Sequence, residues 1–260
     1  MAEEFLHIKD LRIKIKGDDG SRELIKGLNL KVDSQKVVAL VGGSGSGKTT
    51  AGLAILRLLS ESMDVQGGEI LFEGKDLLKA SAGDMRRLRG KDIAMVFQEP
   101  LSAFNPIFTL GFQIAEVLKC HARLNRRQLN ERLYELLDLV GLPEIKRVLR
   151  SYPHQLSGGM RQRAMIAQAI AVNPKLIIAD EPTSNLDVTL QAQIIDLFRK
   201  LRNDLKISML LITHDLGVVG ELADEVAVLF DGRVVESGSA REVLSEPRHA
   251  YTSELTKILY

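Results

Sequence analysis

The sequence has one cysteine, Cys120, and no tryptophan among its 260 residues. A single cysteine excludes an internal disulfide framework and a cluster bound by four cysteines. Lysine and arginine number 35 against 34 aspartate and glutamate residues, so the net charge of +1 gives no electrostatic case for binding nucleic acid. No apolar run approaches the ~18 residues that a membrane-spanning helix needs. Any membrane role is therefore expected to come through a partner.

The first residues, Met1-Ala2-Glu3-Glu4, are acidic and contain no apolar signal segment. An apolar content of 45% and a charged content of 27% are ordinary for a globular protein, and the length suffices for a sizeable core. The basic runs at 86–89 and 126–127 are typical of solvated helix faces. We therefore expect a globular protein in the cytosol.

A glycine-rich stretch separates an apolar segment from a helical one. Residues 42–49 match the pattern G-x-x-x-x-G-K-[ST], between a predicted buried strand at 37–41 and a predicted helix at 50–59. Small residues let backbone N–H groups surround a polyphosphate, and the helix N-terminus adds partial positive charge. Lys48 would reach the β- and γ-phosphates, and Thr49 would bind Mg²⁺. The predicted phosphate-binding residues are Gly42, Gly43, Ser44, Gly45, Ser46, Gly47, Lys48, Thr49 and Thr50.

Other predicted buried strands also end at polar residues, which are Gln98, Asp180, Glu181 and His214. Because ligands of open α/β sheets sit at the carboxyl ends of strands, we expect these side chains to converge with the glycine loop on one phosphate site. Asp180 suits a carboxylate that holds Mg²⁺, and Glu181 suits one that orients or deprotonates the attacking water. His214 would hydrogen-bond the γ-phosphate, and Gln98 would contact both Mg²⁺ and the attacking water.

The stretch Leu156-Ser157-Gly158-Gly159-Met160 has two possible roles. It would put a hydroxyl and two backbone N–H groups at a helix N-terminus, which is a second anion-binding site. A second cradle makes sense if it closes over the nucleotide of another subunit. The same residues are also typical of an ordinary serine N-cap followed by a glycine turn, and the pattern alone leaves both roles open.

Alternating apolar residues predict two half-buried strands, around 11–15 and 28–32, that form a small antiparallel sheet. Turns are expected at 17–20 and at 66–68, and Asp231-Gly232 is expected to join a hairpin. The chain should therefore open with an antiparallel sheet before the glycine loop.

The middle of the sequence changes in composition. Residues 99–106 carry two prolines and predict a loop with an exposed aromatic, Phe104. Residues 111–142 show helical periodicity with almost no strand signal, and a further helix is predicted at about 161–172. We interpret the middle as a helical insertion inside an α/β core.

The order and spacing of these motifs resemble the ATP-binding subunit of ABC transporters over the whole chain. The family's motifs match as follows: Walker A at 42–49, the Q-loop glutamine at Gln98, the signature motif at 156–160, Walker B at 176–180, the catalytic glutamate at Glu181, the D-loop at 184–187 and the switch histidine at His214. The resemblance implies an α/β fold, a RecA-like P-loop NTPase with a mostly parallel core sheet flanked by helices. It also implies an N-terminal antiparallel β subdomain and a helical subdomain insertion.

The resemblance implies that residues 1–260 form a single ABC ATPase domain, with the α/β core at about 1–100 and 155–260 and the helical subdomain at about 101–154. ATP and Mg²⁺ would be the cofactors. The residues implied for catalysis are Glu181, His214 and Gln98, and those implied for Mg²⁺ are Thr49, Gln98 and Asp180.

Two such subunits, identical or paralogous, would sandwich two ATP molecules. Ser157, Gly158 and Gly159 of one chain would complete the site of the other, and closure would pull on two membrane permease subunits. Residues 99–112 and the helical insertion would form the docking groove for the permeases. The chain would then act at the cytoplasmic face of a bacterial membrane, with an external binding protein as an indirect partner.

Three segments place the resemblance in the peptide/nickel importer branch, namely 97–106, 152–160 and 178–183. Near the end, Pro247-Arg248-His249-Ala250-Tyr251-Thr252 resembles that branch's Pro-Arg-His-Pro-Tyr-Thr. Residues 41–44 and 102–106 lean towards the nickel and metallophore members. Peptide, nickel ion and metal–chelator complex all stay open as the transported substrate.

The sequence departs from the family pattern at four places. Ile15 stands where an aromatic usually stacks on adenine, so nucleotide affinity would be weaker and base selectivity looser. Asn185 stands where alanine is common in the D-loop, and Ala250 replaces a proline. Many peptide-importing relatives carry a C-terminal extension with a cysteine cluster, whereas this sequence ends at Tyr260, so no iron–sulfur site is expected.

Two other classes compete with a transport ATPase. A soluble ABC ATPase acting on nucleic acid or ribosomes usually has two cassettes in one chain or a coiled-coil insertion, and this sequence has neither. A weakly or non-hydrolysing regulatory cassette of a heterodimer is disfavoured by Glu181 and His214, although Ile15 and Asn185 leave room for it.

Overall fold

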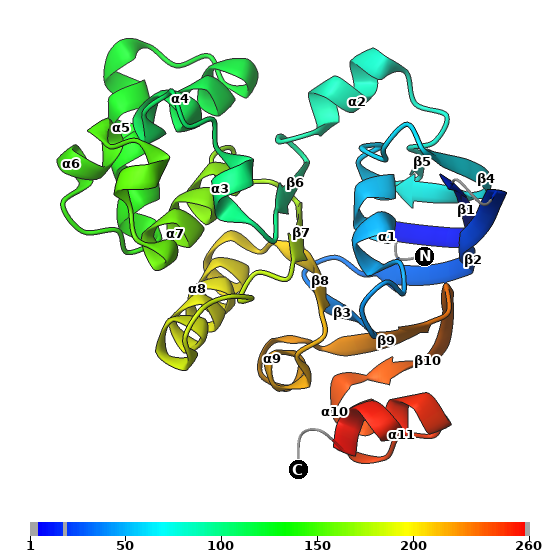
Figure 1. Cartoon of the computed structure of the whole chain (residues 1–260). Helices are drawn as coiled ribbons and strands as arrows, with labels where there is room; N and C mark the ends of the chain where they lie inside the picture. Colours follow the sequence, from blue (N-terminus) through cyan, green and yellow to red (C-terminus); the bar gives the residue numbers. More distant parts are fainter. Residues whose placement is uncertain (1–4, 18–19, 258–260) are drawn as a thin grey trace. The chain divides into compact units, whose positions relative to one another are not determined.

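The computed structural model describes residues 5–17 and 20–257, and the chain divides into two compact units. The first unit comprises residues 1–86 and 208–260, and the second comprises residues 87–207. Figure 1 labels the elements of both units. The division into an α/β core and a helical subdomain at about 101–154 stays a prediction.

The first unit holds most of the strands, which are β1 (Leu6–Gly17), β2 (Gly20–Val32), β3 (Val37–Val41), β4 (Met63–Phe72), β5 (Lys75–Asp76), β8 (Ser208–Thr213), β9 (Glu225–Phe230) and β10 (Arg233–Ser239). Its helices are α1 (Lys48–Ile55), α9 (Leu216–Leu222), α10 (Ala240–Ser245) and α11 (Ala250–Thr256), and α2 (Ala82–Leu88) runs across the boundary between the units.

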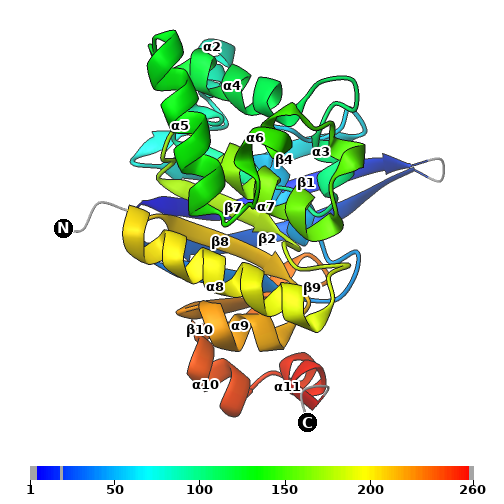
Figure 2. The same ribbon diagram turned by 90° about the vertical axis from the view of Figure 1, so that its left-hand side faces the viewer.

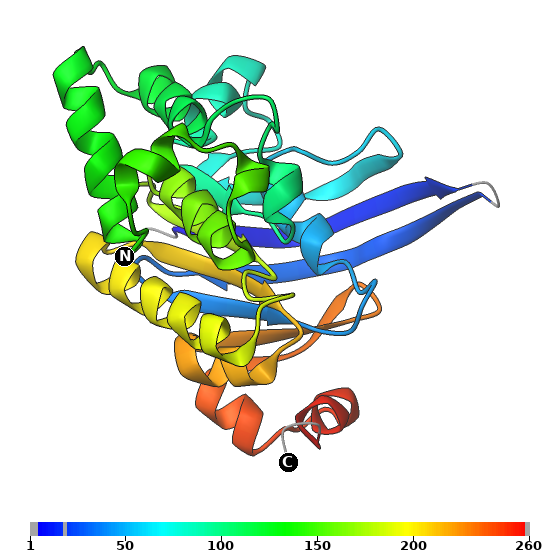
Figure 3. The ribbon, with the colours of Figure 1, turned by 60° about the vertical axis from the view of Figure 1, so that its left-hand side comes forward.

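The predicted antiparallel sheet is confirmed, with the order β2-β1-β4-β5. Strands β1 and β2 form a long ribbon (Figure 3). Leu11 and Ile13 are buried whereas the intervening Arg12 is not, as the alternation predicts. The predicted turn at 17–20 includes residues 18–19, which lie outside the described residues, and Gly17 pairs with Gly20 across the ribbon.

The predicted turn at 66–68 is wrong, because these residues lie inside β4. A Cβ atom on Gly68 would lie only 2.6 Å from the Asp10 carbonyl oxygen on β1, and the backbone of Gly68 has φ +96°. Gly68 thus lets β4 pass close to β1 where the register of the two strands is irregular. From the sequence alone, such a glycine cannot be distinguished from a glycine in a turn.

A mostly parallel sheet forms the other half of the first unit, in the order β10-β9-β3-β8. Strand β3 pairs in parallel with both β8 and β9. All residues of β3 and β8 are buried, as expected of apolar strands covered on both faces. The hairpin of β9 and β10 is confirmed, and Asp231 and Gly232 have φ values of +46° and +74° that suit a tight hairpin turn. Figures 1 and 2 both show α10 and α11 beyond β10.

The second unit contains one parallel strand pair, β6 (Ile93–Val96) and β7 (Leu176–Asp180). Its helices are α3 (Pro100–Ala103), α4 (Leu110–His121), α5 (Arg126–Leu139), α6 (Ile145–Arg150), the short 3₁₀ helix η1 (Pro153–Gln155), α7 (Gly158–Ala169) and α8 (Val188–Leu205). Helix α5 packs against α4, α6 and α7, the cluster drawn in green in Figure 2.

The helical periodicity at 111–142 is confirmed by α4 and α5, and Cys120 lies exposed in α4. The predicted loop at 99–106 is wrong in part, because it contains α3 and its aromatic Phe104 is only 3% exposed. Proline at the first helical position starts the short helix, and Phe104 turns inward after it. The exposed apolar side chains of this region are instead Leu101, Ile107, Phe108 and Phe112.

Within residues 5–17 and 20–257, none of the helices has the length and apolar character required to cross a membrane.

Candidate functional site: a phosphate loop and two strand edges

The glycine-rich stretch at 42–49 leads directly from β3 into α1. A Cβ atom on Gly42 would lie 2.2 Å from the Leu229 carbonyl oxygen, so the loop passes against the end of β9 where only glycine fits. Gly47 is the N-cap of α1 with φ +103°, a left-handed conformation that favours glycine. The pattern therefore encodes a compact loop that brings the N-terminus of α1 next to the end of β3.

Lys48 is the first residue of α1 and is 8% exposed. Its ammonium Nζ donates hydrogen bonds to the carbonyl oxygens of Gly42 at 2.8 Å and Gly43 at 2.9 Å. A buried ammonium has to be hydrogen-bonded, and these carbonyls hold it within the loop. The loop thus concentrates positive charge at a helix N-terminus.

A pocket of about 250 Å³ lies beside this loop and is lined by Arg22, Leu24, Gly45, Gly47, Lys48, Thr49 and Thr50. The buried Oγ of Ser46 has no hydrogen-bond partner among the described residues. A Cβ atom on Gly45 would meet only open space. A cationic pocket with an open glycine face, beside a loop that carries an unused hydroxyl, fits a polyphosphate.

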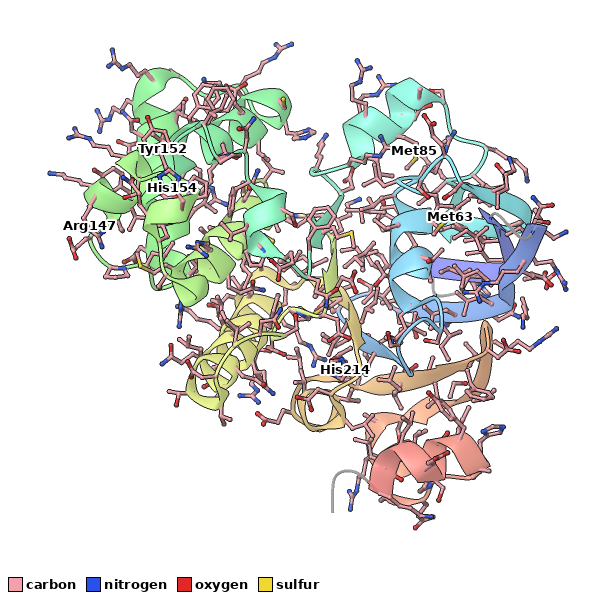
Figure 4. The ribbon with its side chains drawn as sticks, in the orientation of Figure 1. Met63, Met85, Arg147, Tyr152, His154 and His214 are labelled. Atoms are coloured by element: carbon pink, nitrogen blue, oxygen red, sulfur yellow. The ribbon has the colours of Figure 1, made fainter. Side chains whose placement is uncertain are left out.

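Ile15 lies on β1 between two neighbouring strands. It pairs with Arg22 of β2 on one side and with Met63 of β4, marked in Figure 4, on the other. Since Arg22 lines the pocket, the half-buried Ile15 lies one strand away from it. Sequence reasoning missed Arg22, although pairing two alternating strands across the turn at 17–20 would have placed it opposite Ile15.

The strand β2 that carries Arg22 is tied to the β9–β10 hairpin. Lys26 donates a 2.6 Å hydrogen bond to Asp231, and this bond together with the lysine's charge lowers the pKa of that carboxyl below its ordinary value. The Lys26 N–H also donates to the Gly232 carbonyl at 2.8 Å. The hairpin therefore fixes one wall of the pocket.

His214 lies at the same sheet edge as the glycine loop. Strand β8 runs parallel to β3 with Thr213 opposite Val41, so His214 and Gly42 both follow directly at the carboxyl end of their strands. Figure 4 marks the exposed His214 at the end of β8. Asp215 caps α9 by accepting the N–H of Gly217 at 2.8 Å, which fixes the backbone just after His214.

In the second unit, Asp180 and Glu181 stand at the end of β7. Asp180 is 2% exposed, and Glu181 has φ +46°, an unusual left-handed conformation for glutamate. The hydroxyl of Ser184 donates to the Glu181 carbonyl at 2.8 Å and closes this turn. Such backbone strain is common at functional sites, so it is a reason to test Glu181 for a functional role.

Gln98 lies at the same edge as Asp180. Strand β6 pairs in parallel with β7, with Val96 opposite Ala179. The exposed Gln98, Asp180 and Glu181 therefore lie at or just after the carboxyl ends of these two strands. Two of the predicted metal-site residues, Gln98 and Asp180, are thus brought to one edge within this unit. Among the described residues, no group of three or more His, Cys, Asp or Glu side chains converges as a metal site.

Ser157 is the N-cap of α7, since its Oγ accepts the Met160 N–H at 3.3 Å. A Cβ atom on Gly158 would meet open space, whereas one on Gly159 would lie 3.1 Å from Leu190 of α8. Helix α7 therefore begins at Gly158, three residues before the predicted start. The serine cap is confirmed as a local structure, and a role of these residues as a second anion site stays a prediction.

Gln162 of α7 ties the signature stretch to the turn after Glu181. Its side chain is 2% exposed, and its Nε2 donates to the Pro182 carbonyl at 2.6 Å. Sequence reasoning did not single out Gln162, because a glutamine in a helix carries no signal of burial.

Asn185 also makes a specific contact. It has φ +63°, which asparagine tolerates better than most residues, and its Nδ2 donates to the Glu99 carboxylate at 3.3 Å. The stretch after Gln98 is thereby linked to residues 184–187.

The comparisons with known proteins agree with these features. A family model described as "ABC transporter" matches residues 25–184. The oligopeptide transport ATP-binding protein OppD of Bacillus subtilis is 47% identical over 248 residues, which cover 95% of this chain and 69% of that protein. A putative peptide import ATP-binding protein of Brucella ovis is 47% identical over 258 residues, which cover 97% of this chain and 76% of that protein.

Solved structures show the same fold. The dimeric structure of the ABC transporter cassette MJ0796 superposes with a TM-score of 0.81 at 27% identity, covering 91% of this chain and 99% of that one. The structure of MJ0796 in a post-hydrolysis state with ADP and Pi gives a TM-score of 0.81 at 28% identity, again covering 91% and 99% of the two chains. The predicted fold class, a P-loop NTPase with parallel and antiparallel sheets, is confirmed, and the chain belongs to the ABC transporter family as an ABC ATPase.

Proposed function

We propose that this chain is the ATP-hydrolysing subunit of a bacterial peptide importer. The observation that carries the proposal is the buried Lys48 at the head of α1, next to a pocket whose geometry fits a polyphosphate. Family membership supports ATP as the nucleotide. The names of the relatives from Bacillus subtilis and Brucella ovis support peptides as the transported class.

Nucleotide binding falls to the first unit in this proposal. Lys48 would reach the β- and γ-phosphates from its position against the loop carbonyls, and the backbone of residues 42–50 would surround the phosphates. Arg22 lines the pocket and would add a second positive charge beside the phosphates. Ile15, with Met63 and Arg22 as strand neighbours, would give the adenine an apolar contact in place of an aromatic stack.

Hydrolysis falls mainly to the second unit. Thr49, Gln98 and Asp180 would hold Mg²⁺, which neutralises charge on the β- and γ-phosphates when it is bound. Glu181 would take a proton from the attacking water while the oxygen of that water forms a bond to the γ-phosphorus. The bond between the γ-phosphorus and the oxygen that bridges to the β-phosphate would break, giving ADP and phosphate. His214 would hydrogen-bond the γ-phosphate from the end of β8.

A second cassette would complete each site. Ser157, Gly158 and Gly159 of one chain would meet the γ-phosphate held by the other, and the open face of Gly158 leaves room for that approach. The cap bond from Ser157 to Met160 is long, at 3.3 Å, so the hydroxyl gives up little by turning to a phosphate. The dimeric structure of the cassette MJ0796 supports such a pairing of two cassettes.

The permeases would dock on the second unit. The exposed side chains of Leu101, Ile107, Phe108 and Phe112 lie in the predicted docking stretch or at its end, and the rings of Phe108 and Phe112 stack at 4.8 Å. Arg147, Tyr152 and His154 lie on the same helical part of this unit (Figure 4). Docking would hold the chain at the cytoplasmic face of the membrane. Nickel or a metal–chelator complex is the alternative cargo, supported only by the sequence of 41–44 and 102–106.

The test is ATP hydrolysis by the purified chain, alone and with its co-purified permeases and partner cassette. The Glu181→Gln variant should lose about 100- to 10,000-fold in kcat while binding ATP as tightly as the wild type. Equal, slow hydrolysis by wild type and variant in the full complex would support the regulatory, non-hydrolysing cassette instead.

A further inference from the structure

The C-terminal helix α11 contacts the phosphate loop through one hydrogen bond. The N–H of Gly43 donates to the hydroxyl of Tyr251 at 2.7 Å, and a Cβ atom on Gly43 would lie 3.0 Å from that same oxygen. The two residues are 208 positions apart in the chain and belong to the same compact unit. The distance of 2.7 Å between the Gly43 nitrogen and the Tyr251 oxygen lies at the short end of the range for N–H···O hydrogen bonds.

The same peptide group is held from its other side by Lys48. The peptide between Gly42 and Gly43 carries the N–H that Tyr251 receives and the Gly42 carbonyl that accepts from Lys48 Nζ at 2.8 Å. In a trans peptide these two groups point in opposite directions. One peptide plane is thus fixed between the tyrosine hydroxyl and the lysine ammonium.

Both residues of this peptide are glycines, so without outside contacts the plane would rotate freely. A flip would aim the Gly43 N–H at the ammonium and remove a carbonyl that holds it. We propose that Tyr251 is a positioning residue of the phosphate site, which orients Lys48 by fixing the Gly42–Gly43 peptide. The inference rests on the proposed role of Lys48 in binding the nucleotide.

Tyr251 is itself held in place by two contacts. Its ring lies 4.2 Å from the ring of Phe230, the last residue of β9. Its own N–H donates to Nδ1 of His249, the N-cap of α11, at 3.2 Å. The hydroxyl therefore approaches the loop from a fixed position and loses little conformational entropy on bonding.

Glu236 of β10 anchors the segment that precedes Tyr251. Its two carboxylate oxygens accept the N–H groups of Arg248 at 2.8 Å and His249 at 3.0 Å. Partial burial raises the pKa of Glu236, but the nearby Thr252 hydroxyl, these two N–H groups and the charge of His249 together outweigh burial and lower the pKa below its ordinary value. The carboxylate is therefore ionised near neutral pH, where it makes the stronger, charge-assisted bonds.

The test compares Tyr251→Phe with the wild type in equilibrium binding of ATP and, by competition, of inorganic tripolyphosphate. The variant keeps the ring contact with Phe230 and removes only the hydroxyl. Both affinities should fall by roughly two- to ten-fold, because one hydrogen bond is lost. ATP and tripolyphosphate should be affected alike, because Lys48 would contact the phosphates and not the base. The melting temperature of the nucleotide-free chain should stay within about 3 °C, because a hydrogen bond of this size shifts a chain of this length only slightly.

Tyr134→Phe is the matched control, because Tyr134 is an exposed residue of α5 in the other unit. It should bind both ligands like the wild type. Unchanged ATP affinity in Tyr251→Phe overturns the inference, and so does a loss confined to ATP with tripolyphosphate unaffected. A wild type that fails to bind ATP, or a Lys48→Ala variant that binds both ligands normally, would instead contradict the proposed function itself.

Discussion

The two units differ in what they offer a nucleotide. The first unit presents backbone and a buried cation, in which Lys48 is 8% exposed and fixed by two glycine carbonyls. The second presents side chains at strand ends, with Gln98 exposed and Glu181 in a left-handed conformation. In the proposed function, the unit that would bind the nucleotide is thus preorganised in the single chain, while the unit that would supply most of the hydrolytic side chains holds Glu181 in a left-handed conformation and Gln98 exposed. This difference predicts that binding and hydrolysis can be separated by substitution.

Lys48→Ala should produce the largest change on the binding side. Removing an ammonium that makes charge-assisted bonds to phosphates should lower ATP affinity by roughly 100-fold, as measured by titration with a fluorescent ATP analogue. Lys36→Ala, which removes an exposed lysine from the same unit, should bind like the wild type. Normal ATP affinity in Lys48→Ala would contradict the assignment of nucleotide binding to the first unit.

Within the second unit, the loss of the buried Gln162 side chain should lower the free energy of unfolding. Gln162→Ala leaves the buried Pro182 carbonyl without its 2.6 Å bond, which should cost about 1–3 kcal/mol in the free energy of unfolding. Urea unfolding measures this, with Gln168→Ala on the same helix as the control. A loss no larger than that of the control would mean that α7 is not tied to the turn after Glu181.

A smaller effect is expected at Asn185. Alanine tolerates φ +63° poorly, so Asn185→Ala should lose about 1 kcal/mol of stability. Asn185→Gly keeps the conformation available and removes only the side-chain bond to Glu99. If alanine and glycine were equally destabilising, the hydrogen bond and not the backbone would account for the asparagine.

The smallest effect concerns the pH dependence of the first unit. The folded-state pKa of Glu236 lies below its ordinary value, so the ionised carboxylate stabilises the fold above the unfolded-state pKa of about 4.3. That contribution is lost as the pH falls through the lower, folded-state pKa. Thermal melts between about pH 6 and pH 3 should therefore show a steeper loss for the wild type than for Glu236→Gln, and parallel curves would contradict the assignment.

Much of the fold could be predicted because its signals are local. The buried strands β3 and β8 are continuous apolar runs, and the glycine loop is encoded by a fixed spacing of Gly42, Gly47 and Lys48. The prediction was wrong at a glycine and a proline, because both residue types occur in turns and loops but also in other structures. Gly68 permits strands to approach rather than turn, and Pro100 starts a helix rather than a loop.

The candidate site was predictable where strand ends carry polar residues, and the contacts that support it were not. Tyr251 and Gln162 reach their partners over 208 and 20 positions of the chain, and no local spacing encodes such contacts. Arg22, in contrast, could have been placed opposite Ile15 by pairing the two alternating strands. Asn185 could be recognised as unusual, but its bond to Glu99 required the structure.

The most direct measurement of the central claim is a crystal structure of the Glu181→Gln variant with ATP and Mg²⁺. The account predicts two chains per assembly, with Lys48 on the β- and γ-phosphates, Asp180 at the metal, and Ser157 of the second chain at the γ-phosphate. A nucleotide bound away from Lys48, or a Ser157 that remains only the cap of its own helix, would contradict it.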